Sequence, residues 1–315
     1  MKVLVTGGAG FIGSHLVHAL CQRGDQVCVF DNLSSGKLEN IADITDDIEF
    51  IHGDVKNYDQ LVKAAADCDL IYHQAALVSV PASIKDPRLN QASNIVGTAN
   101  MLEAARVNDV KRVVYASSAA VYGDSPKLPK QEDDQPAPIS PYAAAKLAGE
   151  ILLSSYTRTY GLETVSLRYM NVFGPRQDPS SPYSGVLSIF TQSAMGDGKC
   201  KVFGDGKQTR DFVFVSDVVQ ANLLAGSKPY SELPQPAVYN VGRGEETSLN
   251  QIISRLGVIR GEALDVEYKP SREGDIRFSV ADISRSKRYL GYCPSVDIQR
   301  GLQDTMEWVK RSKNG

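Results

Sequence analysis

Tyr142 and Lys146 stand four residues apart and are the side chains of this chain with the most specific chemical potential. Ser140 and Pro141 are typical of a helix N-cap and of the first helical position, so both residues should lie in the first turns of a helix. Residues at i and i+4 share one helix face. There, an ammonium favours a phenolate and lowers the tyrosine pKa from about 10 toward neutral. The pair predicts a base that removes a proton from an alcohol.

Ser118 is the third candidate. The apolar run from Arg112 to Tyr115 predicts a short buried strand, which places Ser117 and Ser118 at its C-terminal end. The Ser118 hydroxyl would hydrogen-bond the phenol or the substrate oxygen. Taken alone, the Tyr-x-x-x-Lys spacing is far more often an exposed helix-surface pair, and the start of the chain is what favours the catalytic interpretation.

Residues 2–31 have the pattern of a dinucleotide-binding unit. A strand (residues 2–6) leads into Gly7-Gly8-Ala9-Gly10-Phe11-Ile12-Gly13, a helix (12–23) and a second strand (26–30) that ends in Asp31. Such glycines let the backbone approach a pyrophosphate at a helix N-terminus. An acid about 20 residues on accepts hydrogen bonds from ribose hydroxyls and repels a 2′-phosphate, which favours NAD over NADP. A tight turn without a ligand would not explain that acid.

Further elements must position these groups. Strands are expected at 49–52, 70–73 and 163–168, and helices at 58–66, 88–107 and from Ser140 onward. This alternation predicts an α/β fold, a Rossmann-type doubly wound parallel sheet, over residues 1–175 with a return of the chain at 211–236. Loops rich in Pro, Ser and Gly follow Pro175, so residues 176–315 are expected to form a smaller, discontinuous α/β substrate domain ending in an amphipathic helix.

Composition narrows the class of protein. The chain has 315 residues and a formal net charge of −3, which argues against nucleic-acid binding. It contains no apolar run long enough to cross a bilayer, and it begins directly with a strand rather than a signal peptide. The five cysteines have no CxxC spacing, and the four histidines form no metal motif. We therefore expect no metal, no membrane and no nucleic-acid partner, and a cytoplasmic protein with free buried thiols.

The spacing Gly7-x-x-Gly10-x-x-Gly13, together with Tyr142 and Lys146, resembles the extended branch of the short-chain dehydrogenase/reductase superfamily, the NAD-dependent epimerases and dehydratases. The resemblance covers essentially the whole chain. It implies NAD as the cofactor, bound by Gly7, Gly10, Phe11, Ile12, Gly13, Asp31, Asn32, Ser35, Gly36, Asp54, Val55, Gln74, Ala75, Ala76, Asn94, Ser117, Tyr142, Lys146 and Tyr169. Two alternatives stay open from the residues themselves: Asp54 as a helix cap and Asn94 as an exposed helix residue.

Asn171, Arg210 and Arg272 lie at or beyond expected strand ends, where ligands bind in open α/β sheets and arginine suits a diphosphate. Their segments resemble nucleotide-sugar motifs. The resemblance implies a UDP-sugar substrate contacted by Ser79, Ser118, Tyr142, Asn171, Gln177, Val186, Val202, Phe203, Arg210, Arg272, Asp275 and Ser279. In this scheme Val202 and Phe203 hold uracil, and Asp275 faces the nucleotide ribose.

The run Ser117-Ser118-Ala119-Ala120-Val121-Tyr122-Gly123 is similar to that of UDP-hexose 4-epimerases, whereas dehydratases and decarboxylases of the branch carry an acid just after the serine or threonine. The implied reaction is C4 epimerisation through a 4-keto intermediate, with Tyr142 as the base, Ser118 on the C4 oxygen and NAD kept tightly bound. A small Ser279 and Gln177 favour N-acetylated as well as plain sugars, although Val78 adds bulk. Alternatives are a UDP-glucuronate or pentose 4-epimerase, a 4-keto reductase, or a non-catalytic NAD sensor. A homodimer formed through residues 88–107 and 142–160 is also expected by the resemblance.

Overall fold

A computed structural model describes residues 1–178, 185–271 and 277–314. A parallel seven-stranded sheet forms its larger part, in the order β11-β6-β5-β4-β1-β2-β3. The strands are β1 (Lys2–Thr6), β2 (Gln26–Asp31), β3 (Ile48–His52), β4 (Leu70–His73), β5 (Arg112–Ser118), β6 (Glu163–Tyr169) and β11 (Val238–Val241). The sequence prediction of a doubly wound parallel sheet is confirmed.

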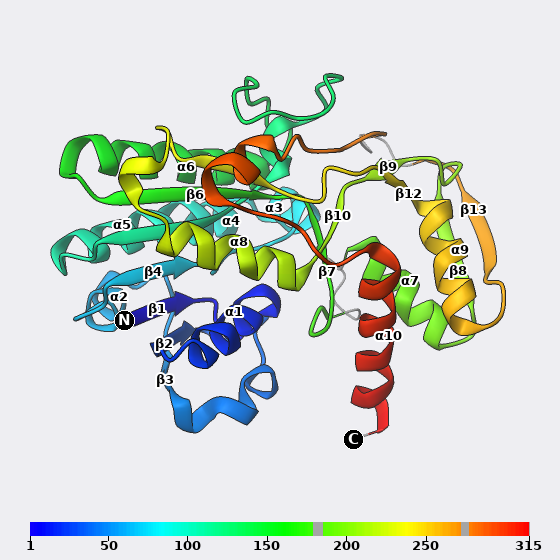
Figure 1. Ribbon diagram of the computed structural model, residues 1–315, viewed down its shortest axis with the longest axis horizontal. Coiled ribbons are helices and arrows are strands. Elements are labelled where there is room, and N and C mark those ends of the chain that lie inside the picture. Colours follow the sequence, from blue (N-terminus) through cyan, green and yellow to red (C-terminus); the bar gives the residue numbers. More distant parts are fainter. Residues whose placement is uncertain (179–184, 272–276, 315) are drawn as a thin grey trace.

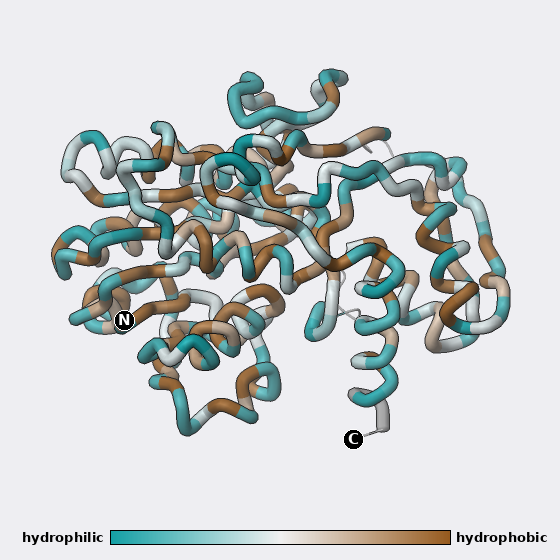
Figure 2. Tube along the Cα trace, viewed as in Figure 1, coloured by the Kyte–Doolittle hydropathy of each residue, from teal (hydrophilic) through white to brown (hydrophobic). Residues whose placement is uncertain are grey.

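Helices cover both faces of this sheet because side chains alternate along each strand. Val3, Val5 and Val29 face a core shared with α1 (Phe11–Gln22) and α8 (Val215–Ser227). Leu4 and Phe30 face the opposite core, shared with α2 (Tyr58–Ala64), α5 (Gly97–Val107) and α6 (Pro141–Tyr160). In Figure 2 the hydrophobic segments run through this layered part, and hydrophilic ones lie in the outer loops.

The helix expected at 88–107 forms as α4 (Pro87–Gln91), a π-helical turn (Ala92–Val96) and α5, preceded by the unpredicted short helix α3 (Val80–Lys85). The stretch expected to return to the sheet at 211–236 includes α8, and β11 follows it and pairs with β6. The extent of the two domains stays a prediction. No helix among the described residues is long and apolar enough to cross a membrane, and the cytoplasmic location also stays a prediction.

The smaller part lies beside the large sheet in Figure 1. It has its own core, which includes the buried side chains of Phe173, Phe190 and Leu302. Its elements are β7 (Asn171–Phe173), α7 (Val186–Met195), β8 (Lys199–Phe203), β9 (Thr209–Arg210), β10 (Phe212–Phe214), β12 (Thr247–Ser248), α9 (Leu249–Arg260), β13 (Asp265–Lys269) and α10 (Ile298–Asn314). The strands form three pairs: β10 with β7, β12 with β9, and β13 with β8. The apolar stripe predicted for the last helix is confirmed, since Ile298, Leu302 and Met306 are buried.

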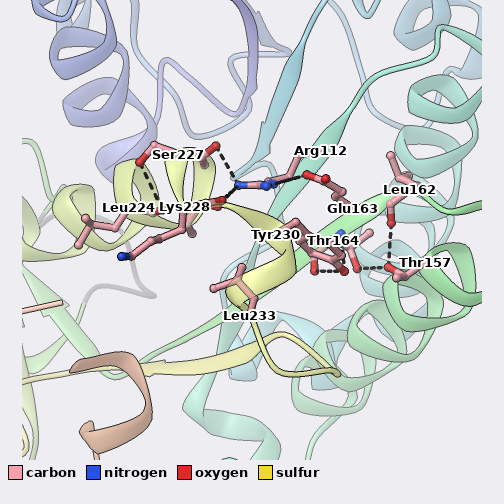
Figure 3. Close-up of polar contacts among 12 residues, drawn as sticks. Arg112, Thr157, Leu162, Glu163, Thr164, Leu224, Ser227, Lys228, Tyr230 and Leu233 are labelled. Atoms are coloured by element: carbon pink, nitrogen blue, oxygen red, sulfur yellow. Dashed lines mark hydrogen bonds and ion pairs between the residues drawn. The ribbon is translucent and has the colours of Figure 1, made fainter. Parts of the chain in front are cut away.

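An ion pair at the N-terminal ends of β5 and β6 fastens α8 to the sheet (Figure 3). Arg112 donates to Glu163 from Nε at 2.8 Å and from Nη2 at 2.6 Å. Its Nη1 also donates to the carbonyl oxygens of residues 225, 226 and 228, at the C-terminal end of α8. The guanidinium thus satisfies carbonyls that have no partner within the helix and places a cation at the negative end of its dipole.

Candidate active site

Tyr142 and Lys146 lie on the buried face of α6, beside the C-terminal end of β5. Ser140 is the N-cap, accepting a hydrogen bond from the Ala143 amide at 3.1 Å, and Pro141 is the first helical residue, as predicted. Tyr142 is 8% exposed and Lys146 2%. The Lys146 Nζ lies 5.9 Å from the centre of the Tyr142 ring. The alternative of an exposed helix-surface pair is therefore wrong.

Burial dominates the electrostatics of this pair. Burial raises the pKa of Tyr142 to about 12, while hydrogen bonding to Ser118 acts in the opposite direction. Burial also lowers the pKa of Lys146 to about 7, against the opposing charge of Glu150. The expectation that Lys146 brings the Tyr142 pKa below its ordinary value is wrong for this structure. The loss of hydration of a buried phenolate outweighs the Ser118 hydrogen bond, which favours the charged form.

Ser117 and Ser118 follow each other on β5 and face different partners. The Ser118 hydroxyl accepts a hydrogen bond from the Ala120 amide at 3.2 Å and contributes to the environment of Tyr142. The Ser117 hydroxyl donates to Glu150 on α6, and its contact with the cofactor stays a prediction. Sequence reasoning missed Glu150, although it stands four residues after Lys146 and therefore shares its helix face.

The glycine-rich turn between β1 and α1 fits a pyrophosphate. Gly7 has a φ of 71°, and a Cβ on Gly13 would lie 2.0 Å from the Gly7 carbonyl oxygen. Within this stretch no side chain caps the N-terminus of α1, and its first turn holds no acid. The first N–H groups of the helix and its dipole thus remain available to an anion, the arrangement that NAD requires at this place.

Asp31 ends β2 next to this turn. Its carboxylate accepts hydrogen bonds from the amides of Ala9, at 3.0 Å, and Leu33, at 2.8 Å. Burial raises its pKa, while these two amides act against the shift. A carboxylate has about four acceptor positions, so capacity for the hydroxyls of a ribose remains.

Asp54 lies beyond β3 and accepts a hydrogen bond from the Asn32 side chain at 3.0 Å. The N-cap of α2 is Asn57, so the alternative of Asp54 as the cap of that helix is wrong. Contact with an adenine stays a prediction for Asp54 and for its buried neighbour Val55.

The chain after β4 passes close to the glycine turn, because a Cβ on Gly7 would lie 2.7 Å from the Ala75 nitrogen. The Gln74 amide donates to the Tyr169 hydroxyl at 3.1 Å and to Asn222 at 3.0 Å. Gln74 thus holds the Tyr169 hydroxyl at the C-terminal end of β6. The small residues after β4 were predicted to let the backbone pass close to the nicotinamide ring, and this arrangement is consistent with room for that ring.

Asn94 is 2% exposed, so the alternative of an exposed polar residue is wrong. Its oxygen accepts from the Leu77 amide at 2.8 Å and its nitrogen donates to the Leu77 carbonyl at 3.1 Å. It sits in the π-helical turn, a local irregularity often found at functional sites. In this structure its side chain fixes the loop after β4, and its contact with the cofactor stays a prediction.

The remaining predicted cofactor residues occupy the turns at the carboxyl edge of the sheet. Phe11 and Ile12 open α1, Ser35 and Gly36 follow β2, and Ala76 follows β4. A Cβ on Gly36 would lie 2.9 Å from Asp31 Oδ2, which places that loop against the acid. All these segments therefore border one edge, and their individual cofactor contacts stay predictions.

The predicted substrate residues are less uniform. Asn171 is exposed at the start of β7, Arg210 and Phe203 are half-buried, and Val186 is the first residue of α7. Val202 is 1% exposed within the core of the smaller part, so its backbone is the part available to a uracil, as the resemblance implies, and this contact stays a prediction.

Among the other predicted substrate residues, the Gln177 side chain donates to the Val172 carbonyl at 3.3 Å, and Ser279 is half-buried. Ser79 is the N-cap of α3 and accepts from the Ala82 amide at 2.9 Å. Arg272 and Asp275 lie outside the described residues. In the part of the chain that is described, no cluster of three His, Cys, Asp or Glu side chains is placed to hold a metal ion.

The cysteines are free but not all buried, because Cys293 is exposed and Cys21 is half-buried. The expectation of five buried thiols is wrong in these two cases. Cys293 follows the π-helical turn at 286–290 on the surface, where a thiol needs no packing role.

Comparisons with known proteins identify a family and similar structures. The model of the NAD dependent epimerase/dehydratase family matches residues 3–242. A UDP-glucose 4-epimerase of Mycolicibacterium smegmatis is 40% identical, over 98% of this chain and 99% of its own length. The structure of a UDP-glucose 4-epimerase from Thermotoga maritima with UDP-glucose has a TM-score of 0.93 at 39% identity, covering 99% of this chain and 100% of the other. A UDP-N-acetylglucosamine 4-epimerase from Methanobrevibacter ruminantium, in complex with UDP-N-acetylmuramic acid, has a TM-score of 0.93 at 38% identity, covering 99% and 98%.

Proposed function

The chain belongs to the NAD dependent epimerase/dehydratase family, and we propose that it is an NAD-dependent UDP-sugar 4-epimerase. The observation that carries the proposal is the meeting of Tyr142, Lys146 and Ser118 at the carboxyl end of β5, near a glycine turn that fits a dinucleotide. Ala119 stands just after Ser118, where an acid would be needed for the loss of water. Tyr142 therefore offers a base for the sugar hydroxyl, and the position just after Ser118 offers no acid for dehydration.

The roles of the side chains follow from their positions. Bound NAD supplies the redox chemistry at C4 of the sugar. Tyr142 removes the proton of the C4 hydroxyl, Ser118 hydrogen-bonds that oxygen, and the Lys146 ammonium stabilises the phenolate. The 4-keto sugar, anchored mainly through UDP, turns its other face to the site, and Tyr142 returns the proton. No net oxidation results.

For the substrate we propose UDP-N-acetylglucosamine and UDP-glucose together with their C4 epimers. One similar structure, at 39% identity, is named as a UDP-glucose 4-epimerase, and another, at 38% identity, as a UDP-N-acetylglucosamine 4-epimerase. Ser279 offers a small side chain at the position where bulk would restrict a 2-acetamido group, and Gln177 offers an amide. Val78 is 64% exposed in a loop, so its bulk is free to turn away from the sugar.

We further propose a homodimer built on α5 and α6. These neighbouring helices expose apolar side chains, among them Val107 and Ile151, the latter 62% exposed. Large exposed apolar side chains on one face are typical of protein interfaces. Sedimentation velocity should give a dimer, and a monomer at all concentrations would refute this assembly.

The test of the proposed activity follows C4 inversion directly. Purified protein is incubated with UDP-N-acetylglucosamine, and separately with UDP-glucose, and proton NMR records the epimer formed without added reductant. Tyr142→Phe should abolish the reaction, whereas Tyr58→Phe, on the surface helix α2, should leave it unchanged. Steady consumption of external reduced cofactor would instead indicate a reductase. Inertness toward both sugars would refute the proposed substrates.

A further inference from the structure

A buried pair of opposite charges lies one helical turn after the predicted catalytic lysine. Glu150 follows Lys146 by one helical turn on α6 and is 7% exposed. Arg168 on β6, 4% exposed, donates to it from Nε to Oε1 at 2.9 Å and from Nη2 to Oε2 at 2.8 Å. This is the paired, planar geometry that makes an arginine–carboxylate contact strong.

Both members of this pair are fully occupied by other parts of the molecule. Arg168 also donates from Nη1 to the Glu132 carbonyl at 3.1 Å, and its guanidinium lies 4.8 Å from the centre of the Tyr122 ring. Burial alone lowers the pKa of Arg168, but the hydrogen bonds and charge of Glu150 outweigh it and raise the pKa. Glu150 additionally accepts the hydrogen bond from Ser117, which turns that hydroxyl away from Ser118.

Lys146 faces few charges besides this pair. Its Nζ donates to the Ala116 carbonyl at 2.7 Å and lies 5.0 Å from the centre of the Tyr115 ring on β5. His73 on β4 stays neutral, because burial lowers its pKa to about 3. Tyr142 shares the helix, and Glu150 is the carboxylate whose negative charge acts on the amine.

We propose that Glu150 is a positioning residue for the reaction: held by Arg168, its carboxylate offsets that buried cation and so lets Lys146 act in its ammonium form. This inference rests on the proposed function for its kinetic consequence, but the charge relation itself does not. Without the carboxylate, the Arg168 cation would remain buried near a second cation. Lys146 would then lose its proton more easily, and the Tyr142 phenolate would lose its stabilising charge.

A second arginine–carboxylate pair provides a matched control. The Arg112–Glu163 pair joins β5 to β6 at the N-terminal ends of these strands (Figure 3), whereas the Glu150–Arg168 pair joins α6 to β6. Arg112 precedes Ser117 by five residues, or about 17 Å of strand. Glu163→Gln therefore removes a carboxylate from a buried arginine without changing the charge near Lys146.

The experiment compares Glu150→Gln, the double variant Glu150→Gln/Arg168→Gln and Glu163→Gln with the wild type. Circular dichroism first establishes that each is folded. The pH profile of kcat/KM is then measured for C4 inversion. In Glu150→Gln its alkaline limb should move to lower pH by about one unit or more, from a charge one helical turn away. The double variant, which loses both charges, should return toward the wild-type profile, and Glu163→Gln should match the wild type.

A titration without turnover separates this inference from the proposed activity. Ultraviolet difference spectra of the NAD-loaded protein report phenolate formation, and subtraction of the matching Tyr142→Phe spectra isolates Tyr142. Lys146 is already neutral where Tyr142 ionises, so the unpaired Arg168 cation should move that ionisation to lower pH in Glu150→Gln, and the double variant should move it back. An unchanged titration in Glu150→Gln overturns the inference, whether or not any sugar is converted. A uniform loss of rate with an unshifted pH profile, equal in the single and double variants, would indicate a purely structural pair and also overturns it.

Discussion

Replacing Lys146 with methionine keeps the length of the side chain and removes its charge. The Nζ lies 5.9 Å from the centre of the Tyr142 ring. At an effective dielectric constant of about 20, two unit charges at that separation interact by about 3 kcal/mol. This interaction corresponds to about two pKa units of the phenol, or a roughly hundredfold change in phenolate fraction.

The effect depends on pH in a defined direction. Burial lowers the pKa of Lys146 to about 7, so the amine carries its full charge only below that pH. We expect the ratio of wild-type to Lys146→Met kcat to be about one hundred at pH 6 and to approach one near pH 9. The ratio of the two kcat values is used because any pH dependence that both proteins share, from the substrate or from Tyr142 itself, cancels in it.

The assay is C4 inversion of a UDP-sugar at saturating substrate and NAD, so that weaker binding of either does not enter kcat. Circular dichroism and bound NAD are measured for each protein at each pH. A ratio that stays constant from pH 6 to pH 9 would show that the loss is not electrostatic. A ratio close to one throughout would refute the role of the Lys146 charge altogether.

Three further predictions test the frame around the site. Arg112→Met should lower the free energy of unfolding in urea by about 3–5 kcal/mol, because it strands Glu163 and the carbonyls at the end of α8, and a loss under about 1 kcal/mol would contradict the pair's role. Gly13→Ala should abolish NAD binding by calorimetry, since its Cβ would meet the Gly7 oxygen at 2.0 Å, and wild-type affinity would refute this geometry. Burial lowers the pKa of His73 to about 3, so the unfolded chain takes up its proton first; stability should fall by about 1.4 kcal/mol per unit between pH 6 and pH 4, and His73→Asn should flatten that slope.

Local signals explain how much of the fold could be predicted. The glycine turn, the strand before it and Asp31 after it lie within about thirty residues, and their order alone defines the unit. The seventh strand, β11 (Val238–Val241), was not predicted although its valines and tyrosine are typical of strands, because no local feature shows that so short a segment joins the large sheet. It is a strand because it pairs with the edge of β6, which is a contact between distant parts of the chain.

The site divides in the same way. Tyr142, Lys146 and Ser118 could be identified because a helix start and a strand end are readable from neighbouring residues. The Glu150–Arg168 pair could not, since it forms only when α6 packs across β6.

The effect of burial on the pKa of Tyr142 also could not be predicted from the sequence. The same packing that orients the phenol raises its pKa to about 12, so orientation and reactivity oppose each other. A nearby cation resolves this conflict only if it stays charged in the same dry environment, which burial also works against. The carboxylate of Glu150, one turn further along the helix, opposes this lowering of the Lys146 pKa, and the buried Arg168 holds that carboxylate in place. Charges of alternating sign therefore follow one another from Arg168 through Glu150 and Lys146 to the Tyr142 phenolate, and each charge stabilises the next.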